Sequence, residues 1–344
     1  MEAVIGCRAS WLLFALSISG VACGEPEAGT WAMRPITRDY TFPARDAHGA
    51  VIPGGVVIGA LDLDEGRMAY VGYCASCHGL DGDGRGSASA GLAPPPRDFR
   101  AATFKFAAVR SGELPGDEDL LRLIQRGSNG TVMPAWGLDE VELRRVVQFI
   151  KTFPPAGCAP DAADCAPEGD RASRWVKVVR EGRRRGQIDA TIGEAVSVTP
   201  DPWKGREEEA RRVGEEVYHR TAQCLSCHPS YLSREELSAA AASPREGLHR
   251  SVPLAADANP FGVEILPPDF TVDPLRSIRP GHEGEDLYRV IAAGVGGVMP
   301  AWIDALRQEQ LWALVHYVRS LAALEGPARA ALRKKLGLPG DPVR

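Results

Sequence analysis

The chain has 344 residues, and this length predicts two or three domains. A content of 44% hydrophobic and 25% charged residues is ordinary for a globular protein, and excludes both a disordered chain and a multi-span membrane protein. A formal net charge of −5 gives no global sign of nucleic-acid binding. The 27 prolines and 37 glycines favour long ordered loops and short helices.

Residues 1–22 have the pattern of an export signal. Arg8 precedes an apolar stretch that is too short, and too interrupted by serine and glycine, to span a bilayer. The small residues before Cys23 resemble the end of a bacterial lipoprotein signal, so we expect Cys23 to carry lipid. Ordinary export with cleavage nearby is the alternative. In both cases we expect a periplasmic protein, and a lipid on Cys23 would anchor it to a membrane.

Two Cys-x-x-Cys-His motifs, at 74–78 and 224–228, are the most specific feature of the chain. This pattern is the attachment signature for c-type haem. Two thiols separated by two residues reach the two vinyl groups of one porphyrin, and the next side chain meets the iron from one face. The sequence therefore predicts two covalently attached haem c groups. Their binding residues would be Cys74, Cys77 and His78 at one site, and Cys224, Cys227 and His228 at the other.

Each motif lies in the same surroundings, which indicates an internal repeat. A glycine and a tyrosine, expected at the start of a helix, precede each motif. A proline-rich Asp-Phe segment, a short helix, Met-Pro-Ala-Trp and an amphipathic helix follow it. The matched landmarks are Gly66 and Tyr70 with Gly214 and Tyr218, Phe99 with Phe270, Asp119 with Asp286, Met133 with Met299, and the helices Val141–Phe153 and Gln310–Leu321.

These landmarks resemble class I cytochromes c, and the mature chain resembles exported dihaem cytochromes c with two such domains in tandem. The resemblance implies an all-α fold: two cytochrome c-like helical domains joined by a long linker rich in proline, glycine and charge. In each domain, a first helix would end in the haem motif and a last helix would cross it. The expected parts are an N-terminal extension at 23–64, domains at 65–153 and 210–323, a linker at 154–209 and a tail at 324–344.

The resemblance places the second axial ligand of each iron at Met133 and Met299. A thioether stabilises ferrous iron, and a six-coordinate iron leaves no open site for peroxide or oxygen. Core packing is the usual role of a lone methionine. Here, however, two of the four methionines after the signal occupy equivalent repeat positions. His219 is the nearest rival to Met299 in sequence, but it belongs to the helix on the proximal side.

Other side chains are expected around the haems. Arg97 is a candidate partner for a propionate. Residues 78–86 resemble the family's glycine loop, and we favour packing at the haem edge over calcium binding because Arg85 occupies a ligand position. The remaining aromatic residues expected to line the haems are Tyr70, Tyr218, Trp136 and Trp302.

The linker contains two further features. Cys158 and Cys165 enclose a short loop, and in an oxidising compartment they are a natural disulfide; a metal site is less expected because no histidine lies near. Residues 171–185 hold seven basic side chains against one acidic side chain. This segment is either a docking face for a partner, propionates or anionic lipid, or a solvated strand or helix with salt partners in the acidic remainder of the chain.

We therefore predict a periplasmic dihaem c-type cytochrome that carries electrons between redox protein partners. It would be free-standing or a subunit of a membrane oxidoreductase complex. We expect no catalytic residue, no small-molecule substrate and no nucleic acid. The alternative from another class is a dihaem cytochrome c peroxidase-type enzyme, which needs one haem with an open or displaceable distal position. The paired methionines argue against it.

Overall fold

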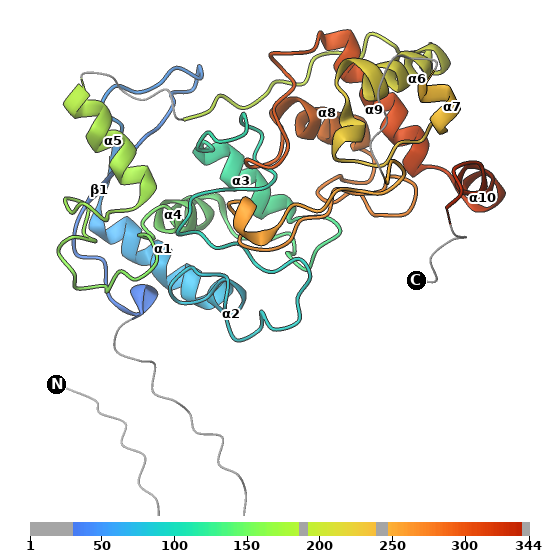
Figure 1. The fold of residues 1–344 in the computed structure, drawn as a ribbon. Coiled ribbons are helices and arrows are strands. Elements are labelled where there is room, and N and C mark those ends of the chain that lie inside the picture. The colour runs from blue at the N-terminus through green and yellow to red at the C-terminus, as the bar shows by residue number, and fades with distance from the viewer. Residues whose placement is uncertain (1–29, 186–191, 239–246, 339–344) are drawn as a thin grey trace, which may run out of the picture.

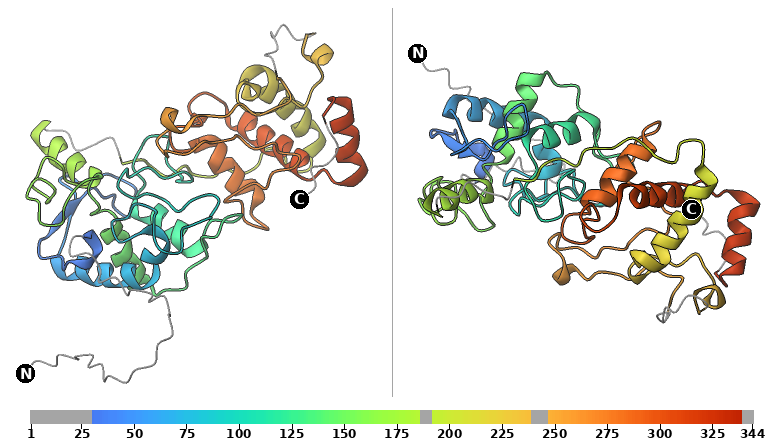
Figure 2. Two further views of the ribbon diagram at one scale, coloured as in Figure 1. Left: turned by 60° about the horizontal axis from the view of Figure 1, so that its bottom comes forward. Right: turned by 90° about the horizontal axis from the view of Figure 1, so that it is seen from above.

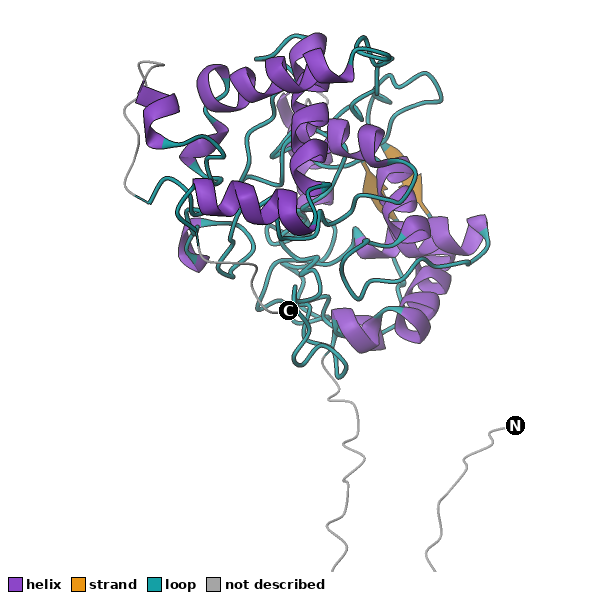
Figure 3. Cartoon of the chain, turned by 90° about the vertical axis from the view of Figure 1, so that its right-hand side faces the viewer, coloured by secondary structure: helices purple, strands orange, loops and turns teal. Residues whose placement is uncertain are grey.

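A computed structural model describes residues 30–185, 192–238 and 247–338. The export signal and Cys23 lie outside these described residues. Within them the chain is mostly helical with little strand, which confirms the helical character of the expected fold (Figure 3). No helix among these residues is both long and apolar enough to cross a membrane.

The described residues form two bodies that lie side by side (Figures 1 and 2). We call residues 30–193 the N-terminal body and residues 194–338 the C-terminal body. Three clusters of buried apolar side chains are present, and each of them lies within one body. Each body therefore has a hydrophobic core of its own.

Most elements are short helices joined by long loops. The N-terminal body contains η1 (Trp31–Met33), β1 (Tyr40–Phe42), β2 (Val56–Ile58), α1 (Ala60–Tyr73), α2 (Ala75–His78), α3 (Asp117–Arg126), α4 (Glu140–Ile150) and α5 (Arg174–Arg185). The C-terminal body contains α6 (Glu207–Glu216), η2 (Val217–Thr221), η3 (Cys224–Ser226), α7 (Arg234–Ser238), η4 (Ala256–Ala258), α8 (Glu283–Ala293), α9 (Gln308–Ala322) and α10 (Gly326–Lys335).

The central contact of each body is a helix crossing. α1 packs on α4, and α6 packs on α9. A Cβ atom added at Gly66 would overlap the backbone of α4 at Arg145, and one added at Gly214 would overlap the backbone of α9 at Ala313. Only glycine therefore lets each pair of backbones approach this closely.

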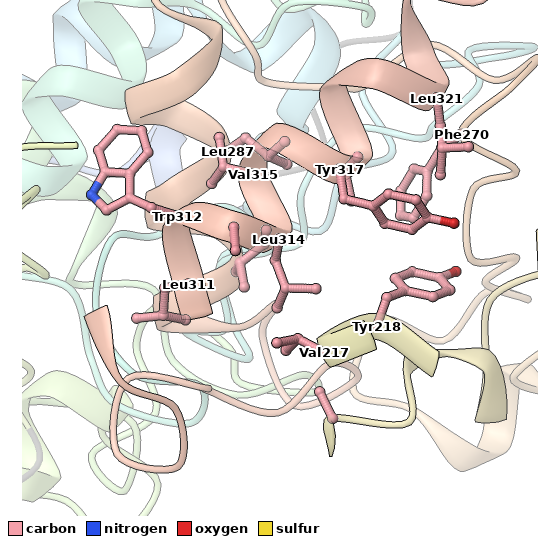
Figure 4. Packing of buried hydrophobic residues seen from close by; sticks show 14 of the residues in the cluster. Val217, Tyr218, Phe270, Leu287, Leu311, Trp312, Leu314, Val315, Tyr317 and Leu321 are labelled. Carbon is pink, nitrogen blue, oxygen red and sulfur yellow. The ribbon is translucent and has the colours of Figure 1, made fainter. Parts of the chain in front are cut away.

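Aromatic rings fill the space beside both crossings. Tyr70 packs against Phe149 and Phe153 with ring centroids 5.2 and 5.3 Å apart. In the C-terminal body, Tyr218 and Tyr317 face each other with centroids 5.5 Å apart (Figure 4). These rings bury large apolar areas and lock the crossing angle of each helix pair.

The crossing corrects one prediction about helix boundaries. Gly66 and Gly214 were expected to begin their helices, but both lie inside them, with α1 beginning at Ala60. A glycine usually interrupts a helix, yet here the gain from close packing outweighs its low helix propensity. The closing helices agree with the prediction to within three residues. Asp139 caps the N-terminus of α4, and its carboxylate accepts a hydrogen bond from the Glu142 N–H at 2.9 Å.

The all-helical expectation misses a short antiparallel pair in the predicted N-terminal extension. β1 and β2 align Tyr40 with Ile58 and Phe42 with Val56. The Phe42 ring is buried beneath the ammonium group of Lys151, whose Nζ lies 4.5 Å from the ring centroid. The extension is therefore part of the N-terminal body and not a separate arm.

The predicted linker also packs onto the N-terminal body. Cys158 and Cys165 form a disulfide, with Cα atoms 5.8 Å apart. On α5, the buried side chains of Trp175, Val176 and Val179 face the core. The first part of this segment is thus a structural element rather than an open connection.

Several arginines of the basic 171–185 segment bind backbone carbonyls of the same body. Arg174 donates to the Gly112 carbonyl at 3.1 Å, and Arg183 donates to the carbonyl of Gly54. Arg180 donates to the Gly169 carbonyl. These contacts attach the segment to its own body through backbone carbonyls, which neither interpretation of the sequence predicted.

The predicted C-terminal tail packs in turn on the C-terminal body. Arg333 of α10 is buried and lies 3.4 Å from the carboxylate of Asp269, while Lys335 pairs with Glu236 at 2.8 Å. Leu336 belongs to the core of that body.

Substituting the glycine of the first crossing tests its role. Gly66→Ala should lower the free energy of unfolding by about 1–3 kcal/mol, because the added methyl group forces α1 away from α4. Chemical denaturation of the holoprotein measures this change.

Gly72→Ala is the matched control on the same helix. An added Cβ at Gly72 meets no atom within 4 Å, so this variant should gain about 0.5–1 kcal/mol from better helix propensity. Equal effects of the two substitutions would contradict the close-contact interpretation.

Candidate haem centres

The two Cys-x-x-Cys-His motifs adopt the same turn. The His78 N–H donates to the Cys74 carbonyl at 2.9 Å, and the His228 N–H donates to the Cys224 carbonyl at 2.9 Å. The four motif thiols form no disulfide. The first turn follows directly on α1, and the second follows α6 after the π-helical turn η2 (Val217–Thr221), so each helix crossing helps to place the thiols and the imidazole.

Each motif histidine is oriented through one ring nitrogen. Nδ1 of His78 donates to the Arg97 carbonyl at 3.0 Å, and Nδ1 of His228 donates to the Pro268 carbonyl at 3.2 Å. This arrangement places the ring proton on Nδ1, so Nε2 carries the lone pair of the ring. Burial lowers the pKa of both histidines, which favours the neutral form that binds metals.

A phenylalanine ring holds each imidazole from the side. Phe99 stacks on His78 with centroids 4.6 Å apart, and Phe270 stacks on His228 at 4.9 Å. Each phenylalanine lies two residues after the carbonyl that binds the same histidine. The proline-rich Asp-Phe segment therefore supplies both the hydrogen-bond acceptor and the ring that orient a ligand.

The two tyrosines tie the haem turns to the helix crossings. Tyr70 donates its hydroxyl hydrogen to the Gly79 carbonyl at 2.6 Å, and Tyr218 donates to the Pro229 carbonyl at 2.8 Å. Both rings are buried, and each accepting carbonyl belongs to the residue after the motif histidine. These tyrosines thus brace the turn, a function that the sequence pattern did not reveal.

The two methionine loops are built alike. Ser128 donates its N–H to the Met133 carbonyl at 3.1 Å, and Val295 donates to the Met299 carbonyl at 3.0 Å. Gly127 and Gly294 begin these loops with φ of +67° and +77°, and a Cβ on either would lie within 2.7 Å of the methionine carbonyl. Glycine is required here by both conformation and space.

The first methionine loop reaches the end of the haem-motif helix. The ring of Trp136 lies 5.6 Å from that of Tyr73, the residue before Cys74. In the C-terminal body, Met299 and Trp302 pack against the hydrophobic core. Both methionines are half-buried.

The glycine loop of the N-terminal body folds back over the haem turn. Gly84 donates its N–H to the His78 carbonyl at 2.8 Å, and Gly86 donates to the Cys77 carbonyl at 3.1 Å. The Asp83 carboxylate accepts from the Arg85 N–H, and the Asp81 carboxylate accepts from the Trp31 N–H. The aspartates of this loop therefore bind protein N–H groups.

The C-terminal body lacks that glycine loop and replaces it with a distant segment. The Val252 N–H donates to the Cys227 carbonyl at 2.8 Å, and the Ser230 N–H donates to the Leu248 carbonyl at 2.8 Å. These pairs join residues 18 and 25 positions apart, and local sequence patterns do not reveal such contacts.

A second difference lies in the helix before the second motif. Tyr218 is six residues before Cys224, whereas Tyr70 is four residues before Cys74. The π-helical turn η2 at Val217–Thr221 absorbs part of this longer spacing.

His219 lies on this π-helical turn and is buried. Its Nδ1 donates to the Glu215 carbonyl at 2.9 Å, and its Nε2 accepts from the Tyr231 N–H at 3.3 Å. Both ring nitrogens are engaged within the protein, so this histidine does not compete with Met299 for iron. Burial lowers its pKa to about 4.

The thiols of Cys74 and Cys224 are not of the kind found in redox dithiols. Burial raises the pKa of each to about 12, so both stay protonated at neutral pH. Reactive dithiols and metal thiolates instead need a lowered pKa. The described residues also contain no group of three or more His, Cys, Asp or Glu side chains placed to hold a bare metal ion.

Residues 61–150 and 209–318 match the family described as cytochrome C oxidase, cbb3-type, subunit III. The chain belongs to this family. Membership of this cytochrome c family implies covalently bound haem c and a function in electron transfer.

A search of solved structures and one of curated proteins complete the comparison. The cytochrome is similar to a chain of a reducing HAO-like protein complex from Kuenenia stuttgartiensis, with 27% identity over 75% of this chain and 96% of that chain, and a TM-score of 0.48. No curated protein matches the chain.

The buried His219 predicts a pH dependence of stability. Its pKa is lower in the folded state than its usual value of 6.5, so the unfolded state binds more protons between pH 6.5 and 4. This histidine therefore contributes stability above pH 6.5 that is lost as the pH falls toward 4, by roughly 3 kcal/mol.

His219→Gln removes this titration and keeps an oxygen that can accept from the Tyr231 N–H. The difference in unfolding free energy between wild type and variant should shrink as the pH falls through this range, as denaturant titrations at several pH values measure. Parallel pH profiles would refute the assignment.

Proposed function

We propose that the protein is a periplasmic dihaem c-type cytochrome that carries electrons between redox protein partners. One haem c would be attached in each body, at Cys74–His78 and at Cys224–His228. The protein acts either alone or as a subunit of a membrane oxidoreductase complex. In this proposal the two bodies correspond to two tandem cytochrome c domains.

The main support is that every contact needed to hold a haem occurs twice. Both sites have a glycine at the helix crossing, a tyrosine bound to the carbonyl after the histidine, and a carbonyl bound to the histidine Nδ1. Both also have a stacked phenylalanine and a methionine loop begun by glycine. If only one haem were bound, the same contacts at the other motif would have no haem to support.

The residues at both sites fit haem c. The protonated thiols of Cys74 and Cys224, and the imidazoles whose Nδ1 is bound to a carbonyl, suit attachment to vinyl groups and ligation of iron. When bound, haem c supplies a one-electron couple between ferric and ferrous iron. The cysteines would hold the porphyrin, His78 and His228 would bind iron on one side, and Met133 and Met299 would bind it on the other.

This ligand set suits electron transfer because it limits rearrangement. The carbonyl bonds of Arg97 and Pro268 hold the imidazoles in place whatever the iron charge, and the short methionine loops restrict the thioethers. Retaining both axial ligands in both oxidation states keeps structural change small. It also excludes peroxide from the iron, which distinguishes this proposal from a peroxidase.

The disulfide between Cys158 and Cys165 supports an oxidising compartment. Together with the export signal, it favours the periplasm. We propose that lipid on Cys23 attaches the protein to a membrane.

Counting the haems tests the proposal directly. The mass of the purified wild-type chain should exceed that of the mature polypeptide by two haem groups. The double variant Cys224→Ser/Cys227→Ser should carry one, and so should Cys74→Ser/Cys77→Ser. A wild-type protein with a single haem, or with none, would contradict the proposal.

The axial ligands are tested by absorption of the oxidised protein. Met133→Ala and Met299→Ala should each remove about half of the thioether-to-iron charge-transfer band and lower the midpoint potential of one haem. Met68→Ala is the control, since Met68 is 63% exposed on α1 and should leave the band unchanged. An absent band in the wild type, with peroxide turnover at enzymatic rates, would favour the peroxidase alternative.

A further inference from the structure

The two bodies meet through the loops that carry the methionines. On one side, Ser277 donates its N–H to the carbonyl of Asn129 at 2.8 Å, next to the Met133 loop. On the other, Ser111 donates its N–H to the Ala293 carbonyl at 2.8 Å, directly before the Met299 loop. Arg110 and Asp304 add an ion pair at 2.8 Å. This interface therefore lies beside both proposed haem centres.

Three cationic side chains gather at this interface. Arg97 and Lys105 of the N-terminal body both lie over the Phe261 ring of the C-terminal body, at 4.3 and 5.7 Å from its centroid. Arg276 of the C-terminal body packs against Gly130 of the N-terminal body. A Cβ atom added at Gly130 would lie 3.3 Å from Cγ of Arg276. The loop that carries Phe261 therefore contacts the N-terminal body shortly after η4.

Close packing holds this group together. A Cβ added at Gly296 would lie 2.6 Å from the Phe261 ring and 3.4 Å from the Cα of Lys105. The backbone of the second methionine loop is thus packed between Phe261 of its own body and Lys105 of the N-terminal body. The cations are held near one another by the docking of the bodies and not by one flexible chain.

None of the three cations forms an ion pair among the described residues, and the Asp98 carboxylate, whose charge acts on Arg97, is paired with Arg100. Other arginines at or near the interface do: Arg110 pairs with Asp304, Arg122 with Asp119, and Arg279 with Asp286. Burial, and then the charges of Arg97 and Arg276, lower the pKa of Lys105. Like charges gathered in a half-buried place are unfavourable unless an anion joins them.

The nearest expected anions are the carboxylates of the first haem. The backbone carbonyl of Arg97 binds Nδ1 of His78, so the cluster begins at the residue that orients an iron ligand. Haem c has two propionate carboxylates, and guanidinium groups bind carboxylates through paired hydrogen bonds. Pro268 stands at the matching place of the second site and has no such side chain.

Lys105 and Arg276 also occupy equivalent places in the repeat. Each lies three residues before a backbone N–H that donates to the aspartate of the repeated Asp-Leu-x-Arg segment. Three residues after Lys105, the Ala108 N–H donates to Asp119 at 2.6 Å. Three residues after Arg276, the Arg279 N–H donates to Asp286 at 3.1 Å. Matching segments of the two bodies thus lie at the interface, with Lys105 on the N-terminal side and Arg276 on the C-terminal side.

We propose that Arg97, Lys105 and Arg276 together bind the propionate carboxylates of the haem attached at Cys74–His78. This inference rests on the proposed function and adds that the C-terminal body supplies part of the counter-charge of the first haem. Cations beside these carboxylates offset negative charge near the iron and favour the ferrous state. The potential of the first haem therefore depends on the docked second body.

Potentiometric titration of the full-length holoprotein tests this inference. Lys105→Gln and Arg276→Gln should each lower the midpoint potential of one haem, and the double variant should lower it further. The affected haem should be the one whose potential Met133→Ala also changes. The pH dependence of that potential should move to higher pH, because a carboxylate that loses cationic neighbours binds protons more readily.

Two control variants make the result specific. Arg276→Lys keeps the charge and should retain most of the wild-type potential. Arg184→Gln removes an exposed cation from α5, away from the interface, and should leave both potentials unchanged.

The possible failures are distinguishable. Wild-type protein with fewer than two haems would refute the proposed function itself. Two haems with intact thioether bands, but unchanged potentials in the double variant, would overturn only this inference. If those variants also lost electron exchange with an acidic redox protein, the cations would belong to a partner-docking surface.

Discussion

The contact between two helix backbones at a glycine is the constraint on which each body depends. At Gly66 and Gly214 the absence of a side chain lets the haem-motif helix lie directly on the closing helix. Tyr70 and Tyr218, one turn later, then reach the carbonyl after each motif histidine. Helix packing is thereby linked to the position of each motif histidine through one hydrogen bond.

The two sites share this constraint but differ in what surrounds them. The first is closed by its own glycine loop, and the second by residues 247–252. The longer spacing before Cys224 is taken up by a π-helical turn that also buries His219. The first site has Arg97 where the second has Pro268, so the charge near the two sites differs although the ligand geometry is the same.

Local sequence patterns predicted the closing helices correctly. They failed for elements whose position depends on packing against distant parts of the chain. The closing helices were predicted within three residues because their apolar spacing is a local signal. The prediction that helices start at Gly66 and Gly214 was wrong. In the sequence, a glycine needed for a close helix crossing cannot be told from a glycine at a helix boundary. The strand pair at 40–58 was missed because three-residue strands leave almost no pattern.

The amino-acid sequence by itself determined the chemistry of the sites. The thiol and imidazole spacing of Cys74–His78 and Cys224–His228 is a covalent property of consecutive residues, and so is its repetition. Only the tertiary structure decided which carbonyl orients each histidine, and that the positive charges of Lys105 and Arg276 come close enough to interact across two bodies. These interactions join residues 19 to 171 positions apart, and no local pattern encodes them because they arise from how packed elements dock.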